Sequence, residues 1–336
     1  MSTFPGQRRD KLLSLEWRPT ASFENLLLRS QLLSAIRAFL GERGLTEVET
    51  PACSSAAATD PALDSLTTRY TGPGAPTGLP LYLHTSPEFA MKRLLAAGSG
   101  PIYQICKVFR DGEAGRYHNP EFTLLEWYRP GYDHHRLMDE VSALVHRVVA
   151  RPLSDTRMSY KELFQLHLGI DPHNASMAAL RGCALERGIT NVDGLRITDS
   201  DTWLDLLLTH CIEPEMGPGI LLVYDFPASQ ASLARIRPGT VPLAERFELY
   251  LDGVELANGF HELADAREQK RRFLQDLEKR RRLNRPVPPA DERLLAALET
   301  GLPECSGVAL GIDRLLMRIA GAEHIEQVLS FPIARA

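Results

Sequence analysis

The sequence of 336 residues lacks the features that several protein classes require. Its five cysteines lie far apart with no CxxC pair and no nearby Cys/His cluster, so neither a disulfide scaffold nor a zinc site is predicted. No apolar run approaches membrane-spanning length, and the first fifteen residues contain no apolar stretch of the secretory type. These absences favour a globular protein of the reducing cytoplasm, with no membrane partner.

Excess positive charge is also absent. The formal net charge is −5 and the isoelectric point is about 6.1, whereas binding of a polyanion depends on Lys and Arg that neutralise phosphates. Any nucleic-acid partner would need a local basic patch, so no tRNA partner is expected. A hydrophobic content of 44% is enough to bury one large core or two modest ones.

The hydrophobic pattern predicts an α+β fold, an antiparallel sheet flanked by helices. Apolar residues recur at helical spacing over 25–44, and a short strand then ends at Pro51. Strand-like runs at 101–109 and 121–128 flank a polar loop, which is typical of a hairpin. The stretch 133–211 is mainly helical. Strands return near 220–224 and 245–258, and a last strand and helix follow within 305–320.

The segment FELYLDGVELANG predicts a hairpin with Asp252-Gly253 in a two-residue turn. In that register Leu251 pairs with Val254 and Glu248 pairs with Ala257, so Glu248 and Glu255 share one face of the sheet. Hard oxygen ligands from one or two carboxylates are what nucleotide-bound Mg²⁺ prefers. The alternative is a solvated sheet face with charges at alternate positions.

The segment FRDGEAGRYHNPEFTLLEWY holds a second group of candidates. Period two over its strand places Phe122, Glu126 and Tyr128 on one face, which mixes aromatic and acidic groups. A buried acid is costly unless it meets a cation, although an incidental carboxylate on a half-buried strand is the alternative. Arg110 and the pair His118-Asn119 are candidates for phosphate and base contacts.

The segment CSGVALGIDRLLM predicts a strand of small residues that runs into a helix. Small side chains permit a ligand to approach the backbone, and Arg314 at the helix start is a candidate phosphate contact. Helix capping by Asp313 is the simpler explanation of this pattern taken alone. The order of the elements is more specific than any one of them. The helix and strand that end at Pro51, the hairpin with Arg110, and the strand and helix with Arg314 resemble in their order the three motifs of class II synthetases.

Taken together, TSPE, the FR…YHNPEF hairpin, ERFE, ELANGFHEL and GIDR resemble the lysyl-tRNA synthetase family over the chain from the first motif to its end. The resemblance implies one class II synthetase catalytic domain over 1–336, with motif 1 at 25–51, motif 2 at 101–128, a helical insertion at 133–211 and motif 3 at 305–320. Motif 1 begins so early that no anticodon-binding domain is expected. By the same resemblance, motif 1 is a dimer element, and a homodimer is expected.

The resemblance also implies roles for individual residues. The ATP contacts would be Arg110, Asp111, Gly112, Asn119, Phe122, Glu255, Leu256, Gly311 and Arg314. The amino-acid contacts would be Ser86, Glu88, Glu126, Tyr128, Asn258, Glu262 and Ala309. Arg110 and Arg314 would be catalytic, and Glu248 and Glu255 would bind Mg²⁺.

Two positions depart from the family pattern. Gly112 stands where the family has a glutamate two residues after the arginine, and Glu113 follows it. Ala309 stands where synthetases have the middle glycine of motif 3, which adds one methyl to the amino-acid pocket. That methyl is expected to crowd the α-amino group of α-lysine and to admit (R)-β-lysine.

Within the family, the stand-alone paralogues are the most similar. They imply an ATP-dependent ligase that forms a (R)-β-lysyl adenylate and transfers the amino acid to a lysine ε-amine of elongation factor P. Activation of α-lysine for a tRNA or another carrier is the alternative. A non-catalytic amino-acid sensor is a third reading, against which the intact Arg110, Glu248, Glu255 and Arg314 argue. The basic segment 267–285 is either a docking surface for the acceptor or a solvated helix face.

Overall fold

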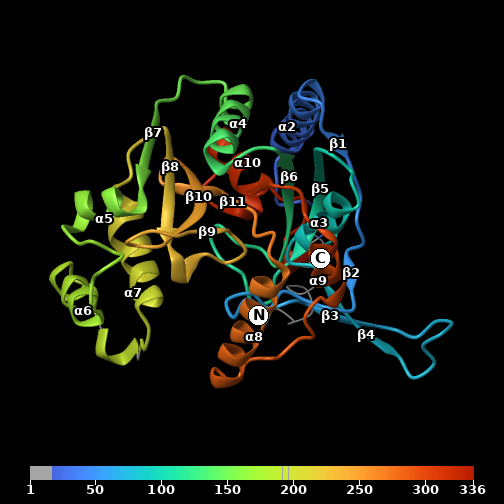
Figure 1. Ribbon diagram of the computed structural model, residues 1–336. Coiled ribbons are helices and arrows are strands. Elements are labelled where there is room, and N and C mark those ends of the chain that lie inside the picture. The colour runs from blue at the N-terminus through green and yellow to red at the C-terminus, as the bar shows by residue number, and fades with distance from the viewer. Residues whose placement is uncertain (1–16, 191, 196) are drawn as a thin grey trace, which may run out of the picture.

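The computed structural model describes residues 17–190, 192–195 and 197–336, so the first fifteen residues considered above lie outside the described part. Figure 1 shows a large central sheet with helices on both faces. No described helix combines the length and the apolar character that a bilayer crossing requires. The α-helices are α2 (Phe23–Glu42), α3 (Glu88–Ala96), α4 (His134–Val148), α5 (Tyr160–Leu168), α6 (Met177–Glu186), α7 (Ser200–Leu207), α8 (Ala266–Arg282), α9 (Glu292–Thr300) and α10 (Ile312–Ala320).

The described strands form two sheets. A nine-stranded sheet has the order β1-β5-β6-β12-β11-β10-β8-β7, with β9 also paired to β10, and a small sheet has the order β2-β4-β3. The strands are β1 (Thr46–Glu47), β2 (Cys53–Ser54), β3 (Thr67–Tyr70), β4 (Leu79–Leu83), β5 (Ile102–Phe109), β6 (Glu121–Pro130), β7 (Asp155–Ser159), β8 (Ile220–Pro227), β9 (Ile236–Arg237), β10 (Leu243–Leu251), β11 (Val254–His261) and β12 (Cys305–Gly311).

The predicted antiparallel sheet is confirmed in its centre and differs at its edges. The pairs from β5 through β6, β12, β11 and β10 to β8 are all antiparallel, whereas β1 joins β5 and β7 joins β8 in parallel. The strand predicted over 45–51 shrinks to two residues at one edge. β7 lies inside the stretch expected to be mainly helical. Its residues are exposed or half-buried without alternation, so the sequence gives no period-two pattern for this strand.

The two faces of the sheet have different cover. On one face α2, α4 and α10 pack against inward residues such as Leu125, Trp127, Phe247 and Leu310, which form the main core. On the other face a smaller core joins α3, α8 and α9 to Tyr128, and another joins α5 to α7 with β8. Among the described residues, neither of these two smaller cores places a helix over the centre of the sheet between them. The polar candidates lie on this part of the sheet.

Candidate active site

A row of side chains crosses the open face of the sheet. Gln104 on β5 pairs with Glu126 on β6, Glu126 pairs with Ala309 on β12, Ala309 pairs with Asn258 on β11, and Asn258 pairs with Glu248 on β10. Directly paired residues point to the same face of a sheet. Five strands from distant parts of the sequence therefore bring four predicted site residues side by side.

The hairpin of β10 and β11 confirms the predicted turn but corrects the predicted register. Asp252 and Gly253 both have positive φ, +51° and +75°, as the two-residue turn requires, and Leu251 pairs with Val254. A register shift then occurs beyond Tyr250, so Glu248 pairs with Asn258 and not with Ala257. A β-bulge adds one residue to one strand, which sequence alternation alone does not reveal.

The bulge has a direct effect on the site. Glu255 and Asn258 are separated by an odd number of positions, so in a regular strand they would point to opposite faces. With the extra residue in β11, Glu255 pairs with Tyr250 and Asn258 pairs with Glu248, which places both on the face of Glu248. The predicted proximity of Glu248 and Glu255 is consistent with this geometry, and the charge of Glu255 contributes to a raised pKa of Glu248.

Glu248 and Glu255 fit a site for a hard cation. Glu248 is 6% exposed, and burial, with the charge of Glu255, raises its pKa to about 6. Its oxygens accept hydrogen bonds from Arg246 and from the Tyr250 hydroxyl at 2.6 Å, which leaves further lone pairs for a metal. Surplus negative charge and carboxylate donors are what Mg²⁺ binding uses.

A third carboxylate, Glu213, was missed by the sequence reading. Burial, together with the charges of Glu255 and Glu248, raises its pKa to about 7. It lies in a single 3-10 turn, Glu213–Glu215, between the helical insertion and β8. No periodic pattern or motif surrounds it, so nothing in the sequence could have identified it.

The amino-acid candidates surround a buried ammonium group. Lys92 Nζ lies 2.6 Å from Oε1 of Glu88 and 2.6 Å from Oε2 of Glu262, and its side chain is 2% exposed. Burial alone would lower the pKa of Lys92, but Glu262 and Glu88 outweigh burial and raise it. The sequence offered one signal for Lys92, since it follows Glu88 by four positions on a helix.

Glu126 completes this acidic pocket. Ser86 Oγ donates to its Oε2 at 2.7 Å and Tyr128 Oη donates to its Oε1 at 2.6 Å. Burial, with the charge of Glu88, raises the pKa of Glu126 to about 8. A Cβ at Gly307 would meet the Tyr128 ring at 2.3 Å and Glu262 Oε1 at 2.5 Å, so only glycine fits there. The geometry brings together all the predicted acidic residues of the amino-acid site.

The nucleotide candidates lie farther along β6 and α10. The Arg110 guanidinium lies over the Phe122 ring, 5.0 Å from its centroid, and 3.8 Å from Oε1 of Glu113. Glu113, and not the neighbouring Gly112, therefore faces the arginine. Asp111 and Gly112 are exposed in the loop between β5 and β6, and Gly112 has φ of +78°.

Arg314 contacts both β11 and the loop between β5 and β6. Its Nη1 donates to the backbone oxygen of Glu255 at 3.0 Å and lies 3.4 Å from Oε2 of Glu255, and its Nη2 lies 2.6 Å from Nε2 of His118. Burial, with the charge of Arg314, lowers the pKa of His118, which favours a neutral ring. The competing prediction that Asp313 caps the helix is wrong, because the N-cap of α10 is Gly311 and no side chain caps it. The Asp313 carboxylate instead accepts from Thr123 N at 2.7 Å and pairs with Arg29.

Asn119 is engaged within the fold. It is buried, its Nδ2 donates to the Glu121 backbone oxygen at 2.6 Å, and its Oδ1 accepts from Ile333 N at 3.0 Å. Gly311 ends β12 next to α10, with the Leu256 oxygen 3.9 Å from the position of a Cβ. The nucleotide roles of Asn119, Leu256 and Gly311 stay predictions.

A cavity of about 1130 Å³ opens beside Ser86 and Glu88. Its walls are the segment 51–65, the start of α7 and the side of α8 that carries Lys279. Arg280, within the predicted docking segment, is buried at 2% exposure, so it does not belong to any docking surface. Its neighbours Lys279, Arg281 and Arg282 are exposed, and the last two pair with Glu278.

Comparisons with known proteins agree with this geometry. The family described as tRNA synthetases class II (D, K and N) matches residues 7–335. A protein of Edwardsiella ictaluri named elongation factor P–(R)-beta-lysine ligase is 52% identical over 321 residues, 95% of this chain and 98% of the relative. Proteins of the same name from Klebsiella pneumoniae and Salmonella arizonae are each 51% identical over the same shares. This chain therefore belongs to the class II tRNA synthetases of the D, K and N type, together with these ligases.

Proposed function

We propose that this chain is an ATP-dependent ligase that activates (R)-β-lysine and transfers it to the ε-amine of a lysine on elongation factor P. The observation that carries the proposal is the acidic pocket of Glu88, Glu126 and Glu262, in which Glu88 and Glu262 pair with one internal ammonium and Glu126 is held by Ser86 and Tyr128. Such a pocket fits an amino acid with an additional amino group. The names of the relatives support the same acceptor and the same amino acid.

The reaction would proceed in two steps. The substrate carboxylate forms a bond to the α-phosphorus of ATP while pyrophosphate leaves, and the acceptor amine then forms an amide while AMP and a proton leave. Arg110 and Arg314 would hold the phosphates in line and offset their charge. Glu248 and Glu255 would hold Mg²⁺, which neutralises phosphate charge when bound. No nucleophile of the protein is needed.

Amino-acid-dependent ATP–pyrophosphate exchange, run with α-lysine and (R)-β-lysine side by side, tests the activation step. Exchange that depends on (R)-β-lysine is expected, and no exchange with either amino acid would favour a non-catalytic sensor. In a second assay, elongation factor P or a lysine tRNA receives the activated amino acid, and mass spectrometry locates it. Transfer to tRNA alone would favour the alternative function. Because the proposed acceptor is a translation factor, the transfer would take place in the cytoplasm.

The pH dependence of substrate binding follows from Glu126. Burial raises its pKa to about 8, so below that pH the carboxyl holds a proton that it must lose before it faces a substrate ammonium. The KM for the amino acid is therefore expected to fall as the pH rises, by about 25-fold between pH ~6.5 and ~8.5, since the ionised fraction of a group with this pKa rises by that factor. Pyrophosphate exchange at saturating ATP measures this. Glu126→Gln should remove the dependence, and an unchanged profile in that variant would contradict the assignment.

Ala309 is expected to set the preference between the two lysines. It lies half-buried between Glu126 and Asn258, where its methyl narrows the pocket near the carboxylate end of the substrate. Ala309→Gly should improve kcat/KM for α-lysine by about 10- to 200-fold, the worth of one methyl clash in a rigid pocket. The effect on (R)-β-lysine should be smaller.

Ala257→Gly serves as the control for Ala309→Gly, since Ala257 lies on an adjacent strand and packs into the main core on the other face. It carries the same loss of a strand methyl without touching the pocket. A gain for α-lysine in both variants, or in neither, would mean that Ala309 does not control the preference.

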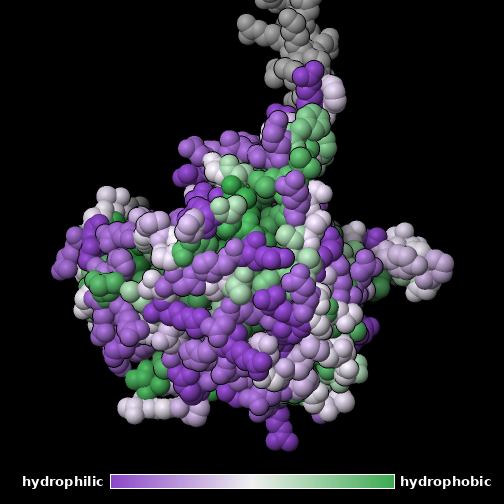
Figure 2. Space-filling model, turned by 90° about the horizontal axis from the view of Figure 1, so that it is seen from above, coloured by the Kyte–Doolittle hydropathy of each residue, from purple (hydrophilic) through white to green (hydrophobic). Residues whose placement is uncertain are grey.

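We also propose that the chain forms a homodimer through α2. Phe23 and Leu27 on this helix are 79% and 61% exposed, and Figure 2 shows apolar surface on the face that carries α2. Large exposed apolar side chains that neighbour each other are typical of an interface. Sedimentation at micromolar concentration should give a dimer, and Leu27→Asp should shift it toward monomer. A wild type that sediments only as monomer would refute this.

A further inference from the structure

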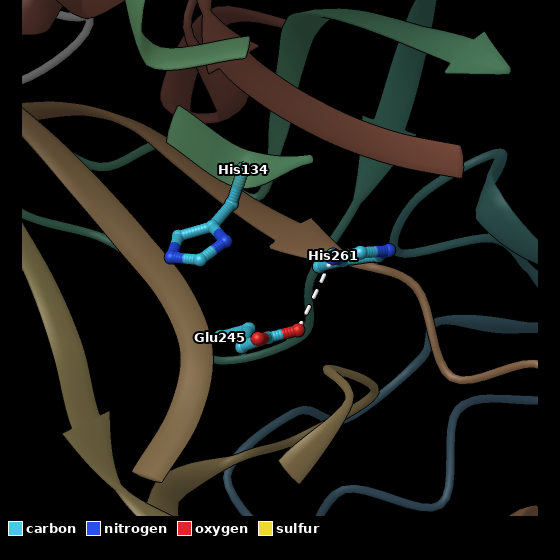
Figure 3. A group of neighbouring side chains, drawn as sticks. All are labelled: His134, Glu245 and His261. Atoms are coloured by element: carbon cyan, nitrogen blue, oxygen red, sulfur yellow. Dashed lines mark ion pairs between the residues drawn. The ribbon is translucent and has the colours of Figure 1, made fainter. Parts of the chain in front are cut away.

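A second cluster of polar side chains lies behind the sheet. His134 is the first residue of α4, Glu245 is on β10, and His261 ends β11 (Figure 3). Arg246 directly follows Glu245, Phe260 directly precedes His261, and Arg246 and Phe260 point to the open face. Because side chains alternate along a strand, Glu245 and His261 point the opposite way. The cluster therefore lies on the other face of the sheet from the row that contains Glu126 and Glu248.

The geometry of the cluster is that of a metal-ligand set. One ligand atom from each of His134, Glu245 and His261 lies within 4.8 Å of the others, and the three residues are buried. Two imidazoles and a carboxylate are a ligand set that zinc takes in sites with three protein ligands and one open position. The three residues come from distant positions in the sequence, which is why no metal-ligand spacing could be recognised there.

The two histidines lack the partners that buried rings need. They are 2% and 3% exposed, and among the described residues none of their four ring nitrogens has a hydrogen-bond partner. His261 Nδ1 lies 3.1 Å from Oε2 of Glu245, close enough for an ion pair but not aligned for a hydrogen bond. A buried polar group without a partner destabilises the folded protein, so two such rings need an explanation.

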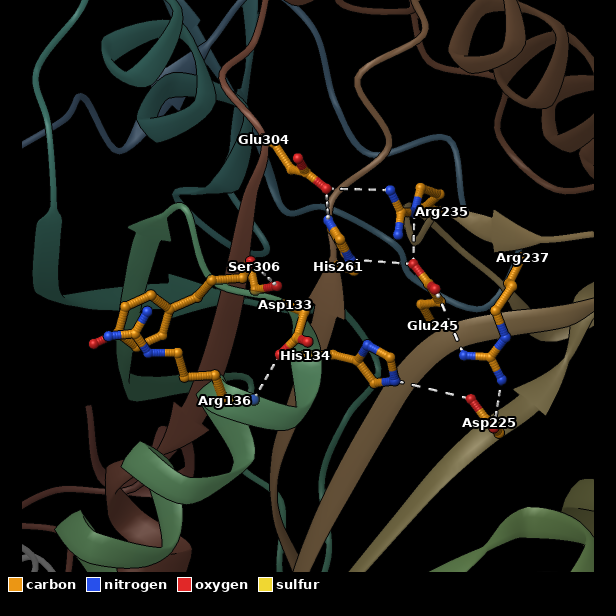
Figure 4. A network of polar contacts seen from close by, with 11 residues as sticks. Asp133, His134, Arg136, Asp225, Arg235, Arg237, Glu245, His261, Glu304 and Ser306 are labelled. Atoms are coloured by element: carbon orange, nitrogen blue, oxygen red, sulfur yellow. Dashed lines mark hydrogen bonds and ion pairs between the residues drawn. The ribbon is translucent and has the colours of Figure 1, made fainter.

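The charges around the cluster leave room for a cation. Figure 4 shows three carboxylates, Asp225, Glu245 and Glu304, in contact with two guanidiniums, Arg235 and Arg237. Counted over these five side chains, three negative charges face two positive charges, so one negative charge is in excess. A bound divalent cation would offset this excess, and neutral imidazole is the form of histidine that binds metals.

The arginines are compatible with a bound metal. Arg235 Nε donates to Oε2 of Glu245 at 2.6 Å, and a carboxylate oxygen has a second lone pair for a metal. Arg237 Nη2 donates to Oδ2 of Asp225 at 2.6 Å, while Oδ1 of Asp225 lies 3.8 Å from Nε2 of His134. Metal-bound carboxylates and imidazoles commonly have such outer partners, which fix their orientation.

We propose that His134, Glu245 and His261 bind one divalent transition-metal ion of the zinc type, with water in the fourth position. The ion ties the start of α4 to β10 and β11 behind the active site. It is separate from the Mg²⁺ site in place and in donor chemistry, because imidazole selects zinc over magnesium. It gives the two unpartnered rings their missing partner.

Equilibrium dialysis of the chelator-treated protein against Zn²⁺ tests the proposal. The wild type is expected to bind one Zn²⁺ per chain, and His134→Ala and His261→Ala are expected to bind it at least about tenfold more weakly. His146→Ala is the matched control, because His146 lies on the same helix, pairs with Asp155 and should leave binding unchanged. Glu255→Gln should also bind Zn²⁺ normally, which separates the two sites.

Two further readouts do not depend on activity. Co²⁺ in place of Zn²⁺ should give the visible absorption of a four-coordinate site in the wild type and not in His134→Ala. Added Zn²⁺ should raise the melting temperature of the wild type only, because a ligand that binds the folded state stabilises it. Circular dichroism of His134→Gln, which keeps a polar side chain, verifies folding. Absence of stoichiometric Zn²⁺ in the wild type, or equal binding by the histidine variants and the wild type, would overturn the proposal.

Discussion

Glu255→Gln is expected to lower ATP–pyrophosphate exchange by about 10²- to 10³-fold and to leave the fold intact. The change removes one negative charge from the proposed Mg²⁺ site without changing the volume of the side chain. It also weakens the contact with Arg314, which lies 3.4 Å from the Glu255 carboxylate. One substitution would thus disturb both groups proposed to contact the phosphates, the Mg²⁺ ion and Arg314.

Three measurements make this result interpretable. Glu186→Gln, on an exposed face of α6, is a control for the chemistry of the substitution and should exchange normally. The melting temperature of Glu255→Gln should match that of the wild type, and raised Mg²⁺ should restore part of the lost exchange. Near-normal exchange at ordinary Mg²⁺ would mean that Glu255 does not hold the metal.

Arg280→Ala is expected to destabilise the folded protein by about 3 to 5 kcal/mol. Its guanidinium donates to the backbone oxygens of Thr59, Asp60 and Pro286 at 3.0, 2.7 and 2.9 Å, and to Oδ1 of Asp64 at 2.8 Å. Without the side chain these four acceptors, of which the Thr59 oxygen belongs to a buried residue, lose their charged donor. The segment that holds them lines the cavity beside Ser86, so the KM for the amino acid should also rise.

Arg281→Ala is the matched control, since its side chain is 58% exposed and pairs with Glu278. Its free energy of unfolding should change by no more than about 0.5 kcal/mol. Urea unfolding of the two variants compares adjacent arginines on one helix. Equal destabilisation would show that the contacts of Arg280 contribute nothing measurable. Because Arg280 is buried, docking of the acceptor protein should be tested at exposed residues of the same helix, such as Lys279 and Arg281.

The sequence predicted the elements whose pattern is local. The helix over 25–44 appears as α2, and the hairpin around the motif 2 loop appears as β5 and β6 with Phe109 paired to Glu121. The Asp252-Gly253 turn was predictable because few residue pairs adopt positive φ at both positions. The bulge near Leu256 was not, since a strand with one extra residue has no distinctive composition.

The candidate site residues also divide into those that a local sequence pattern indicates and those that no local pattern indicates. Glu126 was found because strand alternation and the family motif coincide on it, and its burial in the acidic pocket agrees. Lys92, Glu213 and the pair His134 and His261 were not found, because each meets carboxylates from other elements of the fold. No local sequence pattern shows that these elements come together. Arg280 was read as part of a charged surface, since a sequence does not show which arginine of a basic run turns inward.

The positive charge of Lys92 offsets part of the negative charge of the acidic pocket, as the ammonium groups of a bound substrate would. With Glu88, Glu126 and Glu262 ionised, one internal cation leaves two negative charges, and the two amino groups of a diamino acid would cancel both. A neutral amino acid such as leucine brings a single ammonium, so one anion would be left buried without a counterion. Discrimination against such amino acids would therefore follow from electroneutrality, even where their shape fits.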